Sequence, residues 1–359
     1  SDLRRQRQMC IRDSTTSNPD LKWETVEQFN AGVDLDLYRG RFNVVLDYFV
    51  KNTNDMLAVV PVPGVVGFLP AATNVASARN KGVELALTYR GEKGEWEYDI
   101  NGNISVIRNE VTGLGEGGQP LSTGGVFGTG NDFVAYTDIG LPMAIFYGYE
   151  TAGIFQTDEE AASNTAQPGA MAGDVIFVDQ NGDGAIDEND KTVIGNPHPD
   201  FTYGITSNVK YKQFDLSLFI QGSHGNDLYN GIFRYDLNTT NLPVSALERW
   251  TGPGSTNEHP RISHVDANQN NRVSDRFIED GSFLRIKNLQ IGYSLPDRIV
   301  EKMDIGKFRC YLSASNLLTW TNYTGLDPEI GSRGTLEIGI DRGFYPVSRN
   351  FIAGVNVTF

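Results

Sequence analysis

Oxygen-bearing side chains gather in one short acidic stretch, DQNGDGAIDEND, at residues 179–190. Its sixth residue is Gly184, at the point where a calcium-binding loop turns sharply. Oxygen ligands at loop positions 1, 3, 5, 7, 9 and 12 can surround a calcium ion. The candidate metal ligands at these positions are Asp179, Asn181, Asp183, Ala185 through its carbonyl, Asp187 and Asp190.

The residues that flank this stretch differ from those of a helix–loop–helix calcium site. DVIFV before it has the composition of a strand, and VIGNPHPD after it contains prolines that exclude a helix. Asp190 at position 12 is also shorter than the usual glutamate. Two interpretations stay open. The stretch is either a structural Ca²⁺ site in an external loop or an acidic turn held by side-chain hydrogen bonds to the backbone.

No other group of residues has the spacing of a catalytic or metal site. Nucleophile-elbow, phosphate-loop and dinucleotide-binding motifs are missing from the sequence, so we expect no enzymatic activity. The histidines are scattered and lie mostly in expected loops, which favours solvated side chains over a zinc site. They are His198, His224, His259 and His264.

Aromatic residues in the expected long loops have two possible roles. They can stack on a ligand ring or contact a partner protein, or they can pack within the loops and at a membrane interface. The sequence favours the second role for any single one, and the residues that bind a ligand stay unknown. The aromatic candidates are Tyr229, Phe233, Tyr235, Trp250, Trp320 and Tyr323.

Composition excludes several classes of protein. The formal net charge of -15 argues against binding to nucleic acid. The two cysteines, Cys10 and Cys310, give no disulfide framework. No apolar run approaches the roughly 20 residues of a membrane-spanning helix. Abundant glycine and aromatic residues suit an all-β chain.

The first residues have a composition unlike the rest. One back-translation of Arg4 to Ser14, RRQRQMCIRDS, reproduces a transposon-end adapter used to prepare DNA for sequencing. We therefore expect residues 1–14 to be a non-native segment without structural meaning. Residues 15–359 would then be the C-terminal part of a longer protein whose earlier part is missing.

The rest of the chain alternates apolar and polar residues with a period of two, which predicts β-strands. The connections alternate in length. Short turns are expected at 38–41, 91–94, 211–213 and 296–306, and long loops at 57–79, 158–199, 222–282 and 319–348. Short turns at one end of the strands and long loops at the other are typical of an outer-membrane barrel. Strands are expected at 29–37, 42–50, 83–89, 96–106, 144–156, 201–211, 214–220, 289–295, 308–314 and 351–359.

Strand direction predicts one further element. The strands at 96–106 and 144–156 would both run toward the long loops unless another strand lies between them, and residues 132–140, DFVAYTDIG, are the candidate. The prediction is an all-β antiparallel transmembrane barrel portion of about eleven strands, half of a barrel of about 22 strands. The alternative is a secreted, calcium-stabilised β-sandwich that binds glycans, since alternation with glycine-rich turns also describes sandwiches.

Several segments resemble the C-terminal half of the SusC/RagA-like TonB-dependent outer-membrane transporters of Bacteroidota. The likeness runs from about Asn18 to Phe359, and its motifs are specific together rather than singly. They are NPDLKWETVEQFNAGVDLDL (18–37), NKGVELALTY (80–89), DQNGDGAIDENDKTVIGNPHPDFTYG (179–204), FIEDGSFLRIKNLQIGYSLP (277–296), SASNLLTWTNYTGLDPE (313–329) and YPVSRNFIAGVNVTF (345–359).

This resemblance implies the barrel component of a multi-pass outer-membrane importer. Its substrate would be an oligosaccharide or a peptide. Its partners would be a SusD-like lid lipoprotein, outer-membrane lipid, and TonB through a missing N-terminal part. Because the plug and the earlier strands are missing, we expect this part alone not to transport and to aggregate through its unpaired edges.

Overall fold

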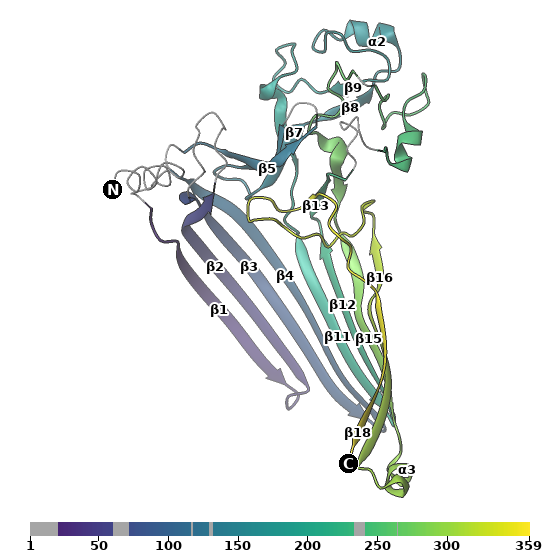
Figure 1. The fold of residues 1–359 in the computed structure, drawn as a ribbon. Coiled ribbons are helices and arrows are strands. Elements are labelled where there is room, and N and C mark those ends of the chain that lie inside the picture. The colour runs from purple at the N-terminus through teal and green to yellow at the C-terminus, as the bar shows by residue number, and fades with distance from the viewer. Residues whose placement is uncertain (1–20, 60–71, 116–117, 129–131, 233–240, 264) are drawn as a thin grey trace, which may run out of the picture.

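Nine long strands form one antiparallel sheet, which we call the wall (Figure 1). The computed structural model describes residues 21–59, 72–115, 118–128, 132–232, 241–263 and 265–359, so residues 1–14 lie outside it. Within these residues the strand order is β1-β2-β3-β4-β11-β12-β15-β16-β18. The bounds are β1 Thr25–Leu37, β2 Phe42–Val59, β3 Ala72–Lys93, β4 Trp96–Leu114, β11 Phe201–Tyr211, β12 Phe214–His224, β15 Phe283–Ser294, β16 Lys307–Thr321 and β18 Asn350–Thr358.

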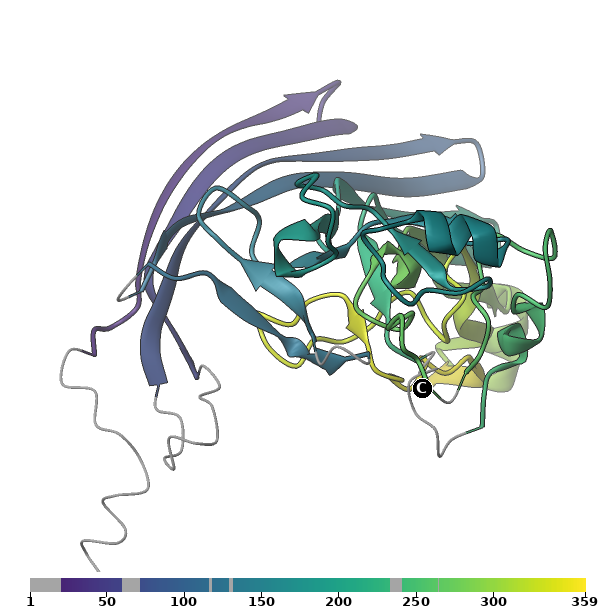
Figure 2. The ribbon, with the colours of Figure 1, turned by 90° about the horizontal axis from the view of Figure 1, so that it is seen from above.

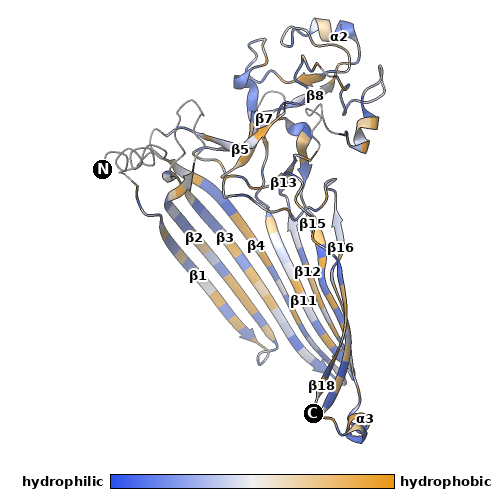
Figure 3. Ribbon diagram, viewed as in Figure 1, coloured by the Kyte–Doolittle hydropathy of each residue, from blue (hydrophilic) through white to orange (hydrophobic). Residues whose placement is uncertain are grey.

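The alternation of apolar and polar residues explains why these segments form strands with two different faces. Successive side chains of a strand point to opposite faces of its sheet. The register pairs Val33 with Leu46, Leu46 with Leu85 and Leu85 with Ile104, so apolar side chains lie next to one another across four strands. Apolar and polar bands therefore alternate along the strands (Figure 3).

Short turns join neighbouring wall strands at one end. They are residues 38–41 between β1 and β2, 94–95 between β3 and β4, and 212–213 between β11 and β12. Residues 295–306 join β15 to β16 and contain α3 (Asp297–Val300) and η5 (Glu301–Met303). The predicted positions of all four turns are confirmed to within a few residues.

The long connections gather at the other end of the wall, where they form what we call the loop assembly. They are 115–200, 225–282 and 322–349, as far as their residues are described; residues 60–71, between β2 and β3, lie outside the described residues. Three small sheets form here, with orders β10-β7-β6-β5, β14-β13-β17 and β8-β9. The bounds are β5 Leu121–Phe127, β6 Asp132–Thr137, β7 Ile145–Tyr149, β8 Thr151–Ile154, α2 Asp158–Ser163, β9 Val175–Phe177, η2 Glu188–Asp190, β10 Lys191–Gly195, β13 Asp227–Asn230, η3 Val244–Glu248, η4 Asp275–Phe277, β14 Ile278–Asp280 and β17 Ile340–Asp341.

The predicted count of about eleven wall strands is wrong for the described residues, which contribute nine. The expected strand within 132–140 exists as β6, but β6 and β7 pair in a small sheet of the loop assembly. Both are short, and most of their side chains are buried on both faces, as in a soluble core. The strand β4 instead pairs directly with β11. One long loop, 115–200, therefore replaces the expected loop 158–199.

The main cluster of buried apolar residues belongs to the loop assembly and to the adjoining ends of β3 and β4, and includes Val111, Val134, Phe146 and Val273. The apolar face of the wall is exposed by contrast. The exposed fraction is 42% for Ile205, 52% for Ile291, 66% for Leu312 and 62% for Val355. No second sheet covers this face in the part of the chain that the structure describes. The sandwich alternative, which needs two apolar faces in contact, is therefore wrong.

The wall is curved, and the loop assembly lies toward its concave side (Figure 2). Among the described residues, no helix is long and apolar enough to cross a membrane.

Aromatic rings cover some glycines of the neighbouring strand. A Cβ atom at Gly222 would lie 2.3 Å from Cζ of Tyr203, its direct partner in β11. Such pairs hold the register where a glycine weakens the sheet.

Candidate functional site

The polar side chains of the wall form a continuous face across its strands. Thr88 pairs with Asn101, and Asn101 pairs with Thr206. Asn101 Nδ2 donates to Thr88 Oγ1 at 2.8 Å. Arg285 on this face contacts residues 327 and 329 of the segment that lies on the concave side (Figure 2). The polar face is therefore the concave one.

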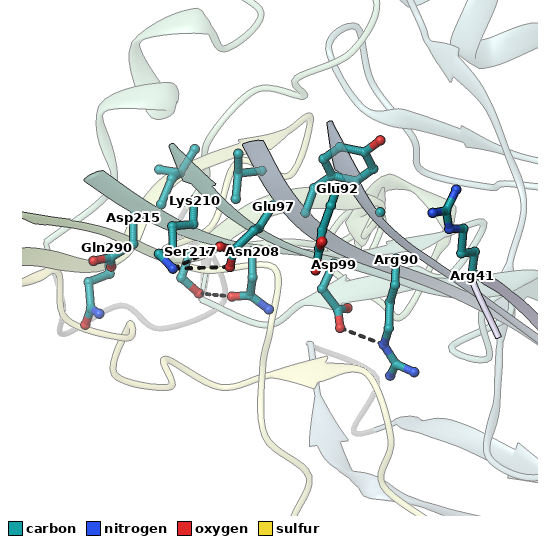
Figure 4. Close-up of a pocket in the computed structure, with 14 residues that line it drawn as sticks. Arg41, Arg90, Glu92, Glu97, Asp99, Asn208, Lys210, Asp215, Ser217 and Gln290 are labelled. Atoms are coloured by element: carbon teal, nitrogen blue, oxygen red, sulfur yellow. Dashed lines mark hydrogen bonds and ion pairs between the residues drawn. The ribbon is translucent and has the colours of Figure 1, made fainter. Parts of the chain in front are cut away.

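Charged residues line a hollow of about 690 Å³ at the turn end of this face (Figure 4). The Arg90 Nε–Asp99 Oδ2 distance is 2.9 Å, and the Lys210 Nζ–Glu97 Oε1 distance is 3.0 Å. These side chains are about half exposed, so their pairing contributes little to stability. Their charges are balanced within each pair. These two pairs are exposed ion pairs with no buried acid or base beside them among the described residues, so they do not form an acid–base catalytic pair.

A second charged cluster lies on the concave face at the loop end and is buried. The exposed fraction of Arg285 is 1%. Its guanidinium donates to Asp327 Oδ1 at 2.5 Å, to Glu329 Oε2 at 2.8 Å and to Thr319 Oγ1 at 2.9 Å. Lys287 Nζ also donates to Glu329 Oε2, at 2.8 Å. Two cations and two carboxylates thus fix the 322–349 connection to β15.

The acidic stretch 179–190 lies in the loop assembly between β9 and β10, and its first half is a tight turn. Asp179 accepts hydrogen bonds from the backbone N–H of Gly182 at 2.7 Å and of Gly184 at 2.8 Å. The N–H of Asp183 donates to Asn181 Oδ1, and the N–H of Ala185 donates to Asp183 Oδ1. These side chains stabilise the turn through bonds to nearby backbone. The bonds from Gly184 and Gly182 lower the pKa of the Asp179 carboxyl, because they favour its charged form.

The second half of the stretch contains η2, capped by Asp187. Asp190 is fully buried and accepts from the N–H of Gln180 at 2.9 Å and of Asp187 at 2.7 Å. Among the described residues, no group of three or more histidine, cysteine, aspartate or glutamate side chains is arranged to hold a metal ion. The six predicted ligands lie in one loop, and the side-chain oxygens of the five other than Ala185 accept hydrogen bonds from the backbone.

The three described histidines are not brought together. His198 Nε2 donates to the carbonyl of Met143 at 2.8 Å, and burial lowers the pKa of its ring. The ring of His224 lies 5.0 Å from that of Phe201. His259 Nε2 lies 3.4 Å from Glu248 Oε2. His264 lies outside the described residues.

The six aromatic candidates have different environments. Tyr229 and Tyr323 are buried, and Tyr229 belongs to the main apolar cluster. Trp250 Nε1 donates to Gln156 Oε1 at 3.2 Å, and Trp320 is 53% exposed at the end of β16. Phe233 and Tyr235 lie outside the described residues. Packing is therefore the role of the two tyrosines, as the sequence favoured.

Sequence reasoning missed two features of the concave side. One is Arg285, whose position between apolar residues in FLRIKN was the available signal for a buried charge. Its partners in DPE are more than 40 residues away, so the sequence did not show the pairing. The other is the stack of Tyr136 on Tyr147, with ring centroids 4.4 Å apart. Burial and nearby Asp138 raise the pKa of Tyr136 to about 12.

Comparison with protein families gives a match over most of the chain. Residues 10–317 match the family model described as TonB dependent receptor-like, beta-barrel. TonB-dependent receptor P3 of Formosa agariphila is 31% identical over 96% of this chain and 35% of its own length. TonB-dependent receptor SusC of Bacteroides thetaiotaomicron is 29% identical over 95% of this chain and 32% of its own length. The chain thus spans about a third of these relatives.

Comparison with solved structures also gives matches over most of the chain. The RagAB peptide importer in its closed-closed state matches with a TM-score of 0.75 and 28% identity. The match covers 96% of this chain and 36% of the other. The open-open state of that importer matches with a TM-score of 0.74 and 27% identity.

Proposed function

Because the chain belongs to the TonB-dependent receptor-like β-barrel family, we propose that it is part of the wall and outer loops of a nutrient importer in the bacterial outer membrane. In this proposal the apolar face of the wall contacts lipid and the polar concave face surrounds the passage. One observation carries it. The nine-stranded sheet exposes its apolar face and has its long connections at a single end.

Two partners belong to this proposal. A lid lipoprotein of the SusD type would cover the loop assembly, and TonB would supply energy to the complete protein. Similarity to SusC and to the RagAB importer supports both partners. The described surface suits the lid, because the loop assembly lies at the end of the wall away from the short turns (Figure 1).

We propose an oligosaccharide as the substrate and a peptide as the second candidate. The first rests on the likeness of the sequence motifs to the SusC/RagA type. The second is favoured by the likeness to RagAB, which is a peptide importer. The two ion pairs at the turn end of the concave face suit neutral, hydrated solutes of either class.

Uptake by cells with and without the complete gene tests the function. We expect deletion to lower uptake of labelled oligosaccharides at least tenfold, restoration of the gene to recover it, and loss of TonB to abolish it. A fall in peptide uptake instead supports the second candidate. Unchanged uptake of both classes would overturn the proposal. Purification of the tagged protein tests for the lid lipoprotein in the same cells.

We also propose that residues 179–190 bind Ca²⁺ in a structural role. The oxygen spacing supports this, as does the tight turn at Gly182 and Gly184, whose φ angles are positive at 73° and 85°. The Asp179 carboxylate, whose pKa is lowered by backbone hydrogen bonds from Gly184 and Gly182, is held in its charged form, as a cation ligand must be. Asp190 fits least well, because both its oxygens accept hydrogen bonds inside the protein.

A further inference from the structure

The connection between β16 and β18 takes an indirect route. These strands pair with each other from Lys307–Thr358 to Ser315–Asn350. Asn316 Nδ2 donates to the carbonyl of Ser348 at 3.0 Å, so the two ends of the connection lie close together. Residues 322–349 nevertheless extend over the concave side of the wall, as the yellow segment in Figure 2. We call this segment the strap.

The buried charged cluster holds the root of the strap. Arg285 binds Asp327 and Glu329, and Lys287 binds Glu329 again. Asp327 Oδ2 also accepts from the N–H of Val347 at 3.2 Å. One carboxylate therefore joins the outgoing limb, the returning limb and the wall.

Contacts with two other loops hold the far part of the strap. Thr123 Oγ1 of β5 donates to the carbonyl of Leu336 at 2.7 Å, and Arg342 bonds to the carbonyl of Gly124. The N–H of Tyr229 donates to the carbonyl of Gly339 at 2.9 Å, beside the pairing of β13 with β17. The strap thus runs from the wall to loops that are more than 90 residues away in sequence.

The far part of the strap is also buried. Ile340 belongs to the main apolar cluster. Tyr323 donates to Asp341 Oδ2 at 2.6 Å, and its burial and this carboxylate raise the pKa of Tyr323. A segment anchored at its root and along its far part is a fixed part of the mouth rather than a freely moving loop.

We propose that the strap sets the upper size of the solute that enters the passage, and that Arg285 is the positioning residue that holds it there. This inference rests on the proposed import function, because it takes the concave side as the passage. The chemistry supports a strong anchor. Removal of Arg285 leaves the buried Asp327 without a cation, while Glu329 keeps Lys287, and the root of the strap loses its bonds to Arg285 of the wall.

Energised uptake of graded oligosaccharide and peptide ladders tests the proposal in cells with the complete protein. Wild type defines the longest oligomer that enters. With Arg285→Met we expect at least a threefold rise in uptake of the next longer oligomers. Arg309→Met is the matched control. Its guanidinium also pairs with a carboxylate, Asp215, but at the turn end of the wall, so the limit should not move.

Surface amounts of each variant are measured first, so that lost assembly is not read as lost transport. If Arg285→Met does not reach the membrane, the double variant Asp327→Asn and Glu329→Gln replaces it and should raise the limit too. An unchanged limit, or an equal fall at every length, overturns the inference while the wild-type uptake still supports the function. A wild type that imports neither ladder overturns the proposed function itself.

Discussion

The wall and the loop assembly bury their side chains in opposite ways. In the wall, apolar side chains such as Leu312 and Val355 are mostly exposed on one face, and that face needs lipid to cover it. In the loop assembly, Phe146, Val134 and Val273 have no exposed surface and pack against one another. The loop assembly thus has a buried apolar core like that of a soluble protein, whereas the wall that carries it exposes its apolar face.

The two regions also satisfy their backbones differently. Neighbouring wall strands pair their backbones over most of their length, so the wall needs few side-chain bonds. The irregular loops need side chains to replace these bonds. Gln167 donates to the carbonyl of Val175 and accepts from the N–H of Phe177, and Asn270 accepts from the N–H of Val175. In the loops, buried side-chain amides therefore satisfy the backbone N–H and C=O groups that strand pairing satisfies in the wall.

The largest effect is expected from a cavity in the loop assembly. Phe146→Ala should destabilise it by about 3–5 kcal/mol, because a buried aromatic ring is lost and the site collapses only in part. Limited proteolysis should cut the loops faster, while wall assembly, measured by electrophoretic mobility before and after heating, stays unchanged. Phe133→Ala is the control, since that ring is 41% exposed. Equal loss of the wall would show that the two regions are one cooperative unit.

A charge on the apolar face tests the wall. Ile205→Arg should destabilise the protein by about 2–4 kcal/mol in lipid, because this position on β11 lies on the apolar face that the proposed function assigns to the bilayer. The side chain at position 206 points to the polar face, so Thr206→Arg should change the stability by an amount close to zero. Urea unfolding in vesicles measures both. If both substitutions lower the stability equally, the assignment of the two faces is wrong.

Calcium should have a smaller effect, confined to the loop assembly. For a dissociation constant of 10⁻⁴–10⁻³ M, 1 mM Ca²⁺ stabilises by about 0.4–1.4 kcal/mol. Proteolysis between β9 and β10 should slow on addition of Ca²⁺ and recover its rate with a chelator. Asp179→Ala should remove the response. Equal rates with and without the ion would leave the stretch as an acidic turn.

The smallest effect is expected from pH at His198. Its pKa is lowered in the folded protein because burial disfavours the charged ring. The neutral, buried ring therefore makes its full contribution to stability above the unfolded pKa of about 6.5. This contribution is lost as the pH falls below that value, because the ring of the unfolded chain then binds a proton more readily than the ring of the folded protein. Hydrogen exchange at Met143 and its neighbours should speed up on acidification. The same acid response in His198→Gln would contradict this assignment.

The sequence predicted the wall better than the loops, for a physical reason. A strand between two media needs period-two alternation, and Phe29 to Leu37 or Phe351 to Phe359 show it without help from other segments. β6 and β7 are buried on both faces, so their sequences do not show which sheet they join. That ambiguity produced the wrong count of wall strands. The acidic stretch was predicted as a unit, but its sequence did not show that Asp190 is buried.

The sequence by itself determined the nine wall strands, the short turns, the two unlike faces of the wall and the place of the acidic stretch, because each depends on residues near in the chain. Only the tertiary structure decided that the loops form one assembly with its own apolar cluster, and that Arg285 binds Asp327 and Glu329 to hold residues 322–349 on the concave side. Those contacts join segments far apart in sequence, and no local pattern specifies which distant carboxylate a buried arginine will meet.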